Sequence, residues 1–233
     1  MQEIALIGIM FRTKICGITS VDDCQVCIDA GAEAIGLNFY PPSTRFLDAS
    51  ETVAAEISQH SQGQLSTVGL WVNTDIKEIV GTAESLNLNY IQLHGDEDPA
   101  YIKRLASLLG TKRILKAFRL GRHDAAYILD FVSACEIFGV RLAAIIVDAY
   151  DPENYGGTGK TLDWKSFNLL NPLLEGYPLI LAGGLSGSNV TEAIQAANPY
   201  GIDVASGVES EPGRKDPEKV RVFVANAITA LDA

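Results

Sequence analysis

The sequence is short of several features, and each shortage excludes a class of protein. Its 233 residues include only 4 cysteines, too few for the dense disulfides of a small secreted scaffold. We therefore expect Cys16, Cys24, Cys27 and Cys135 to be reduced thiols in a cytoplasmic protein. No apolar run approaches the roughly 18 uncharged residues that span a bilayer. The first ten residues also lack the basic and apolar pattern of a secretion signal.

Basic residues are scarce as well. The chain carries 18 Lys and Arg against 29 Asp and Glu, a net charge of −11. Nucleic acids and anionic membranes are bound by clustered Lys and Arg, so we expect neither as a partner and expect a small molecule instead. Cys24 and Cys27 form a C-x-x-C within an expected helix, without the second Cys or His pair that a zinc site needs. We expect both to pack in the core, and we expect no metal.

What the sequence does contain is a regular alternation of short apolar runs and longer segments of helical period. The expected strands are residues 13–16, 34–39, 67–72, 90–93, 113–117, 143–147, 179–182 and 203–205. The expected helices are residues 21–30, 50–59, 75–86, 98–108, 123–138, 163–170, 187–197 and 217–231. Eight strand and helix pairs in a chain of this length predict a single (β/α)8 TIM barrel of the α/β class. A doubly wound open sheet is the structural alternative.

The N-terminal residues fall outside this pattern. A closed barrel has no free edge with which the apolar residues 2–9 could pair. We therefore expect residues 1–12 to be an extension and residues 13–233 to be the catalytic barrel. On this interpretation residues 1–9 are dispensable, and Met10 is a candidate start of translation.

Glycine and polar residues gather where the expected strands end, which is where barrels of this kind build their active sites. Gly183-Gly184 follows the seventh strand, and Ser206-Gly207 follows the eighth. These two loops commonly bind phosphate in this fold, through backbone N–H groups that no side chain obstructs. The sequence thus predicts a phosphorylated ligand, although glycines that only form tight turns would give the same pattern. The glycine-rich residues 156–159 lack a nucleotide-binding spacing, so no organic cofactor is expected.

Two groups able to transfer protons end strands on different sides of the expected mouth. Cys16 ends the first strand and Asp148 follows the sixth. A thiol with a pKa near 8.5 and a shielded carboxyl can serve as base and acid, although a lone Cys at a strand end is more often a small buried apolar residue. His94 ends the fourth strand, where a structural role and ligand contact are both open. Arg45, in a Pro-Pro-Ser-Thr-Arg loop, suits recognition of a carboxylate.

A series of these segments matches, in order, the pattern of one enzyme family. The segments are Lys14-Ile15-Cys16-Gly17-Ile18-Thr19, Phe39-Tyr40-Pro41 with Ser43 and Arg45, Gln92-Leu93-His94-Gly95-Asp96-Glu97, and residues 155–164, 181–190 and 203–216. They resemble phosphoribosylanthranilate isomerase of tryptophan biosynthesis. Two features depart from the family pattern, the thirteen residues before Lys14 and the large aromatic Trp71, and neither touches the expected site.

The resemblance implies an acid and base catalysed Amadori rearrangement, the third step of tryptophan synthesis from chorismate. N-(5-phosphoribosyl)anthranilate would become 1-(2-carboxyphenylamino)-1-deoxy-D-ribulose 5-phosphate without metal or organic cofactor. By analogy Asp148 protonates the furanose ring oxygen and Cys16 removes the C2 proton. The resemblance also implies that Arg45 holds the anthranilate carboxylate and His94 contacts the substrate. The phosphate-binding residues would be Gly183, Gly184, Ser206 and Gly207. We expect a monomer or a homodimer.

Two other interpretations stay open at this stage. One is a lyase on the same kind of barrel, such as indole-glycerol-phosphate synthase, for which Lys116 at the end of the fifth strand would be the lysine acid. The other is a barrel that binds a phosphorylated ligand without turning it over.

Overall fold

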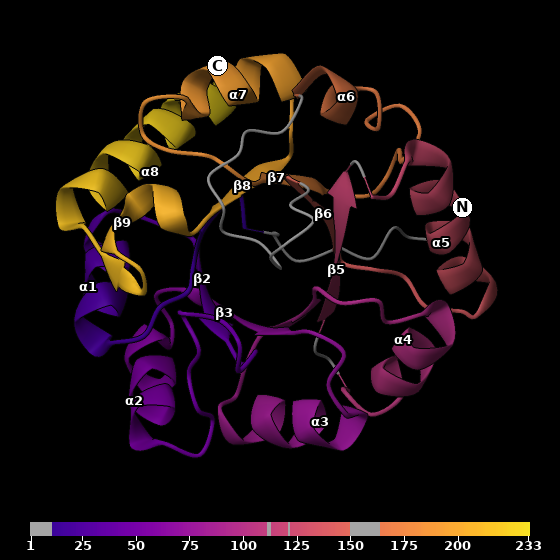
Figure 1. The fold of residues 1–233 in the computed structure, drawn as a ribbon, viewed down its shortest axis with the longest axis horizontal. Coiled ribbons are helices and arrows are strands. Elements are labelled where there is room, and N and C mark those ends of the chain that lie inside the picture. Colours follow the sequence, from indigo (N-terminus) through magenta and orange to yellow (C-terminus); the bar gives the residue numbers. More distant parts are fainter. Residues whose placement is uncertain (1–10, 111–112, 121, 150–163) are drawn as a thin grey trace.

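The computed structural model describes residues 11–110, 113–120, 122–149 and 164–233. Eight parallel strands close into a barrel in chain order, with helices around the outside (Figure 1). Lys14 of the first strand pairs with Asp203 of the eighth. The (β/α)8 prediction is confirmed, and this pairing of the first and last strands excludes the open sheet.

The strands and helices lie close to their expected positions. The barrel strands are β1 (Thr13–Cys16), β2 (Ala34–Asn38), β3 (Ser66–Trp71), β4 (Tyr90–Leu93), β5 (Arg113–Leu120), β6 (Ala144–Ala149), β7 (Leu179–Ala182) and β8 (Gly201–Val204). The helices are α1 (Val21–Asp29), α2 (Thr52–Ser61), α3 (Ile76–Ser85), α4 (Pro99–Ala106), α5 (Ala125–Ile137), α6 (Trp164–Asn168), α7 (Val190–Ala197) and α8 (Pro217–Leu231). No described helix is long and apolar enough to cross a membrane.

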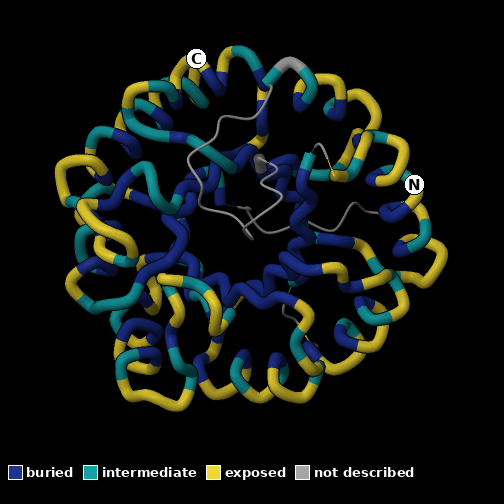
Figure 2. The backbone as a smooth tube through the Cα atoms, in the orientation of Figure 1, coloured by how far each residue is buried: buried dark blue, intermediate teal, exposed yellow. Residues whose placement is uncertain are grey.

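Side chains alternate between the two faces of each barrel strand and so form two separate buried clusters. Outward residues such as Ile15, Val147 and Val204 pack beneath the helices in the main core. A smaller cluster that includes Phe11, Tyr90 and residues of β2, β3, β5, β6 and β7 packs separately. Figure 2 shows the result as a buried ring of strands inside helices whose outer faces are exposed. Both faces of each strand are thus covered, which explains the continuous apolar runs in the sequence.

Helix starts follow the local capping signals in most places. Asp98 and Asp216 accept hydrogen bonds from the first turns of α4 and α8, and a proline follows each of them. The polar residues Asn73 and Thr74 suggest an earlier start for helix α3, but the residue that caps this helix is Asp75. Asn73 instead takes a left-handed backbone with φ of 52°.

Three elements were not expected from the sequence. After β8 the chain forms a short 3-10 helix, η1 (Ser206–Val208), and then a hairpin of β9 (Glu209–Glu211) and β10 (Arg214–Lys215). Strand β5 also runs three residues beyond its expected end and carries Arg119 into the barrel wall. These additions lie at the carboxyl ends of strands, where the candidate site residues gather.

Two residues of the expected N-terminal extension contact the barrel. Phe11 is buried with its ring edge-on to Tyr90 at 5.5 Å, and the carbonyl of Arg12 accepts a hydrogen bond from Ile202. Phe11 and Arg12, which lie within the expected extension, therefore pack on the barrel. Residues 1–10, including Met10, lie outside the described residues.

Candidate active site

The candidate site lies at the carboxyl ends of the strands. Cys16 on β1 and Asp148 on β6 are both buried and alternate with the outward residues Ile15 and Val147. Their side chains therefore point toward the barrel interior, and two strands, β7 and β8, separate them on the shorter path around the barrel. The structure thus brings the expected base and acid to one mouth.

Cys16 has an unusually small neighbour across the sheet. It pairs in register with Gly36 of β2, and a methyl group added at Gly36 would stand 2.7 Å from Cys16 Sγ and 3.1 Å from Lys14 Nζ. The missing side chain is what leaves room for the thiol and the ammonium group. Burial raises the pKa of the Cys16 thiol, while the Lys14 ammonium acts in the opposite direction.

A buried ion pair lies beside Cys16. Lys14 Nζ is 2.9 Å from Asp203 Oδ2, and both side chains are at least nine-tenths buried. They come from the adjacent strands β1 and β8, where the two residues are register partners. Desolvation opposes the charge on Lys14, but Asp203 and Cys16 outweigh it and raise the pKa of Lys14. The mouth therefore contains a fixed positive charge that the sequence prediction did not include.

Asp148 faces a histidine. His94 Nε2 lies 3.4 Å from Asp148 Oδ2, and His94 Nδ1 lies 3.2 Å from the side-chain amide nitrogen of Gln92. Arg119 pairs in register with Asp148 and donates to the carbonyl of His94. The His94 ring thus lies between Gln92 and the expected acid.

Arg45 is not an isolated guanidinium. Its Nε and Nη2 donate to the two carboxylate oxygens of Glu209 at 2.7 and 2.6 Å. Glu209 also accepts from Lys215, and these two partners lower the pKa of the Glu209 carboxyl despite its burial. The pair fixes the guanidinium plane over the mouth and leaves Nη1 and one Nη2 hydrogen for a second acceptor. It also fastens the loop after β2 to the hairpin after β8.

Glycine is required in both expected phosphate loops, by backbone conformation after β7 and by close packing after β8. Gly183 and Gly184 have φ values of 90° and 67°, in the left-handed region. Asn189 ties this loop together by donating to the carbonyl of Gly184 and accepting from the backbone of Ser186. A side chain at Gly207 would collide with the backbone carbonyl of Leu185, so the loops after β7 and β8 lie against each other. Residues 150–163, with the glycine-rich segment expected to be a loop, lie outside the described residues.

Lys116 does not reach the mouth. It has the same parity on β5 as the outward residues Ile114 and Phe118, and its Nζ contacts Glu97 Oε2 at 3.0 Å and the Gly95 carbonyl at 2.7 Å. The side chain lies among the helices, over the Phe118 ring. The lysine required by the lyase interpretation is therefore directed away from the interior.

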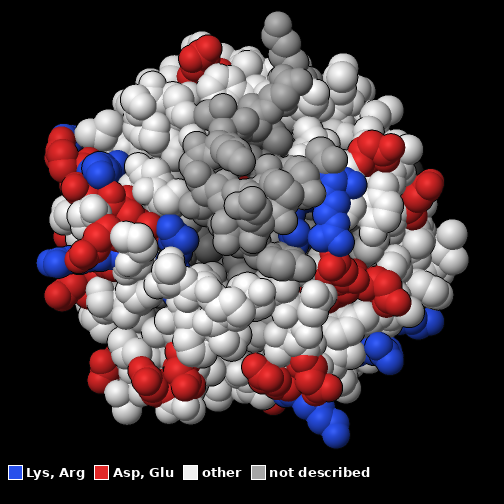
Figure 3. Space-filling view, viewed as in Figure 1, with Lys and Arg blue, Asp and Glu red and all other residues white. Residues whose placement is uncertain are grey.

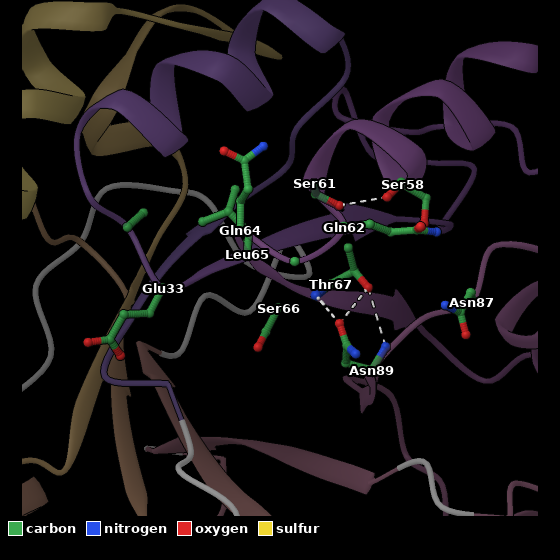
Figure 4. A pocket seen from close by; sticks show the side chains of 12 residues that line it. Glu33, Ser58, Ser61, Gln62, Gln64, Leu65, Ser66, Thr67, Asn87 and Asn89 are labelled. Carbon is green, nitrogen blue, oxygen red and sulfur yellow. Dashed lines mark hydrogen bonds between the residues drawn. The ribbon is translucent and has the colours of Figure 1, made fainter.

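Two further features concern the surface. A pocket of about 620 Å³ lies at the opposite, amino-terminal end of the strands (Figure 4). Its polar groups include Thr67 and Asn89, which hydrogen-bond each other, and Ser61, which bonds the Ser58 carbonyl. Its lining contains no cysteine for the expected base and no arginine or lysine to bind the substrate's anionic groups. In Figure 3 a few basic side chains lie near the centre of the displayed face, and basic and acidic side chains both lie toward its rim.

The remaining cysteines have structural positions. Cys24 and Cys27 lie on the buried face of α1 and Cys135 on that of α5, and all four cysteines are free thiols. Burial raises the pKa of Cys24 and of Cys135 to about 11. Among the described residues, no group of three or more His, Cys, Asp and Glu side chains is placed to hold a metal ion.

Sequence reasoning missed Lys14, Asp203, Glu209 and Lys215 as parts of this site. One signal was available: Lys14 is two residues before Cys16 on a strand, so the two must share a face. The same two-residue period on β5 places Lys116 on the outward face with Ile114 and Phe118. The Arg45 and Glu209 pair joins residues 164 positions apart, and no local pattern could indicate it.

Comparison with known proteins decides the family. The family model described as N-(5'phosphoribosyl)anthranilate (PRA) isomerase matches residues 13–226. The chain belongs to the PRA isomerase family. A PRA isomerase from Geobacter metallireducens is 41% identical over 218 residues, which cover 94% of this chain and 99% of that protein. One from Trichlorobacter lovleyi is 40% identical over 222 residues, covering 95% and 100%. Both relatives are isomerases by name.

Solved PRA isomerase structures share the architecture over nearly the whole chain. The crystal structure from Thermotoga maritima superposes with a TM-score of 0.79 at 32% identity, covering 94% of this chain and all of that one. A PRA isomerase in complex with reduced 1-(o-carboxyphenylamino)-1-deoxyribulose 5-phosphate gives a TM-score of 0.76 at 30% identity, with the same coverage. A third structure, of generated monomers of the dimeric Thermotoga maritima enzyme, gives a TM-score of 0.76 at 31% identity, covering 94% of this chain and all of that one. The segments that resembled this family in the sequence thus lie within a confirmed family match.

Proposed function

We propose that this chain converts N-(5'-phosphoribosyl)anthranilate to 1-(2-carboxyphenylamino)-1-deoxy-D-ribulose 5-phosphate, with Asp148 as general acid and Cys16 as general base. One arrangement carries the proposal. Cys16 on β1 and Asp148 on β6 point into one mouth, and the glycine loops after β7 and β8 lie between them around the barrel. A phosphate held by Gly183, Gly184, Ser206 and Gly207 would place the attached ribose between the acid and the base.

The reaction needs two proton transfers on the sugar. Asp148 donates its proton to the furanose ring oxygen, the bond between C1 and that oxygen breaks, and the anthranilate nitrogen supplies the electron pair that forms a Schiff base. The Cys16 thiolate then takes the proton from C2, which gives an enolamine that tautomerises to the ketone. A positioned acid or base contributes roughly 10²- to 10⁴-fold to such a step.

The anthranilate end of the substrate needs its own contact. Arg45 has donors left after pairing with Glu209, and a guanidinium binds a carboxylate with charge-assisted hydrogen bonds. His94, whose Nε2 lies 3.4 Å from Asp148 Oδ2, would contact the substrate and orient the acid. We also infer that the protein is cytoplasmic and that it is active as a monomer or as a homodimer.

The experiment is an assay of the purified protein for loss of N-(5'-phosphoribosyl)anthranilate fluorescence, with the product identified by mass spectrometry. We expect the ketose product, without added metal or cofactor. Conversion of that product to indole-glycerol phosphate would support the lyase interpretation instead. Binding without turnover would contradict the proposed isomerase.

A further inference from the structure

Cys16 lies among several charged groups, and the question is which of them acts on its sulfur. From the strands come Lys14 of β1 and Asp203 of β8. Arg45 follows β2, and Glu209 and Lys215 belong to the hairpin after β8, with Asp23 of α1 behind Lys215. On the far side of the mouth stand His94 and Asp148.

Two of the three cations are held by the Glu209 carboxylate: Lys215 with all of its donors engaged, and Arg45 with its remaining donors assigned above to the substrate carboxylate. Lys215 Nζ has three hydrogens and three acceptors, the carbonyls of Cys16 and Ala205 and the Glu209 carboxylate, at 2.7, 3.2 and 2.8 Å. Arg45 directs Nε and Nη2 at Glu209. Lys14 differs, because only one of its three hydrogens is taken, by Asp203 Oδ2 at 2.9 Å, and its ammonium group lies beside the Cys16 side chain.

The local geometry brings the Lys14 ammonium group close to the Cys16 sulfur. Lys14 and Cys16 are two residues apart on β1, so their side chains leave the same face. Gly36 stands opposite Cys16, where a methyl group would come within 3.1 Å of Lys14 Nζ and 2.7 Å of Cys16 Sγ. The Lys14 side chain is fully buried, so water does not screen its charge from the sulfur.

We propose that Lys14 is a positioning residue for the isomerisation: anchored by Asp203, it keeps a positive charge beside Cys16 Sγ and stabilises the thiolate that removes the C2 proton. The inference rests on the proposed function, in which Cys16 is the base. No proton leaves Lys14 in this role. It stays an ammonium group throughout, while the thiol gains and loses the transferred proton.

A buried thiol that acts as a base needs a group that stabilises its thiolate form. Burial in the barrel disfavours a thiolate and raises the pKa of Cys16. Below that pKa, each further unit of increase lowers the fraction of thiolate about tenfold. A cation within a few ångströms is the ordinary means of recovering that fraction, and opposite charges at such range shift a pKa by roughly 1 to 3 units.

The test is the pH dependence of Cys16 alkylation by iodoacetamide in the full chain, measured by mass spectrometry of the peptide that contains Cys16. In Lys14→Met we expect the midpoint to rise by at least about one pH unit, which slows alkylation roughly tenfold at neutral pH. Lys116→Met is the matched control, because it also removes a buried ammonium paired with a carboxylate, but among the helices. Its Cys16 midpoint should stay at the wild-type value.

Turnover supplies the second measurement. The kcat of Lys14→Met should fall by the same factor near neutral pH and recover as the pH rises, with KM changed less than about twofold. If Lys14→Met fails to fold, Lys14→Met/Asp203→Asn removes both charges without leaving a buried carboxylate unpaired, and its midpoint should still lie above that of the wild type.

An unchanged midpoint in the folded variant would overturn the proposal. So would a raised midpoint without the matching shift in the pH profile of kcat, because Lys14 would then tune a thiol that is not the base. Absence of isomerase activity in the wild type is a different result. It would refute the proposed function, while the alkylation measurement would still report whether Lys14 stabilises the thiolate.

Discussion

Replacing Gly36 by alanine tests the packing that positions Cys16. The added methyl group would stand 2.7 Å from Cys16 Sγ and 3.1 Å from the Cys16 Cα. Ordinary contacts begin near 3.5 Å, so the sulfur must move by most of an ångström. A misplacement of about 1 Å can lower turnover roughly 10²-fold, and we expect kcat to fall by that order.

The same substitution should cost moderate stability. Added volume in a packed interior typically costs about 1 to 3 kcal/mol. For a chain of this size each kcal/mol lowers the melting temperature by roughly 2 to 4 °C, so a decrease of about 2 to 12 °C is expected. The assays are substrate fluorescence for kcat and circular dichroism for thermal unfolding.

Gly81→Ala is the control for this prediction. Gly81 lies exposed in α3, and a methyl group there would meet nothing within 4 Å. Alanine in a helix interior is favoured over glycine by about 0.5 to 1 kcal/mol, so this variant should be slightly more stable and fully active. A kcat for Gly36→Ala within twofold of the wild type would refute the reasoning that Cys16 Sγ must hold its present position.

The other predictions concern binding, positioning and the N-terminus. Arg45→Ala should lower kcat/KM by roughly 10- to 150-fold, the equivalent of losing about 1.5 to 3 kcal/mol of charge-assisted bonding; an unchanged kcat/KM would show that the carboxylate is held elsewhere. His94→Asn should lower kcat moderately, since His94 orients Asp148; a loss as deep as that of Cys16→Ala would mean that the base has been assigned to the wrong residue. Deleting residues 1–9 keeps Phe11 and Arg12, which pack on the barrel, so melting temperature and activity should stay close to those of the full chain; a drop of several degrees would show that the deleted segment packs as well.

The barrel was predictable because its signals are local. Continuous apolar runs such as residues 144–147 mark strands covered on both faces, and capping residues such as Asp98 and Asp216 mark helix starts. The β9 and β10 hairpin gave no such signal. Its strands are two and three residues long, and much of it is polar and exposed.

The site was predictable in part for the same reason. The strand ends predict Cys16, His94 and Asp148 at one mouth, where the structure has them. The ion pairs were not predictable, because Lys14 with Asp203 and Arg45 with Glu209 join residues 189 and 164 positions apart. Only closure of the barrel and folding of the hairpin bring these charges together.

The central claim is that Cys16 and Asp148 are the base and acid of one reaction. Its most direct test is kcat at saturating N-(5'-phosphoribosyl)anthranilate for Cys16→Ala and Asp148→Asn beside the wild type, with the melting temperature of each variant as the check on folding. Both variants should remain folded and lose roughly 10²- to 10⁴-fold in kcat. Near-normal turnover in either folded variant would contradict the account, because the proton transfer assigned to that residue would then belong to another group.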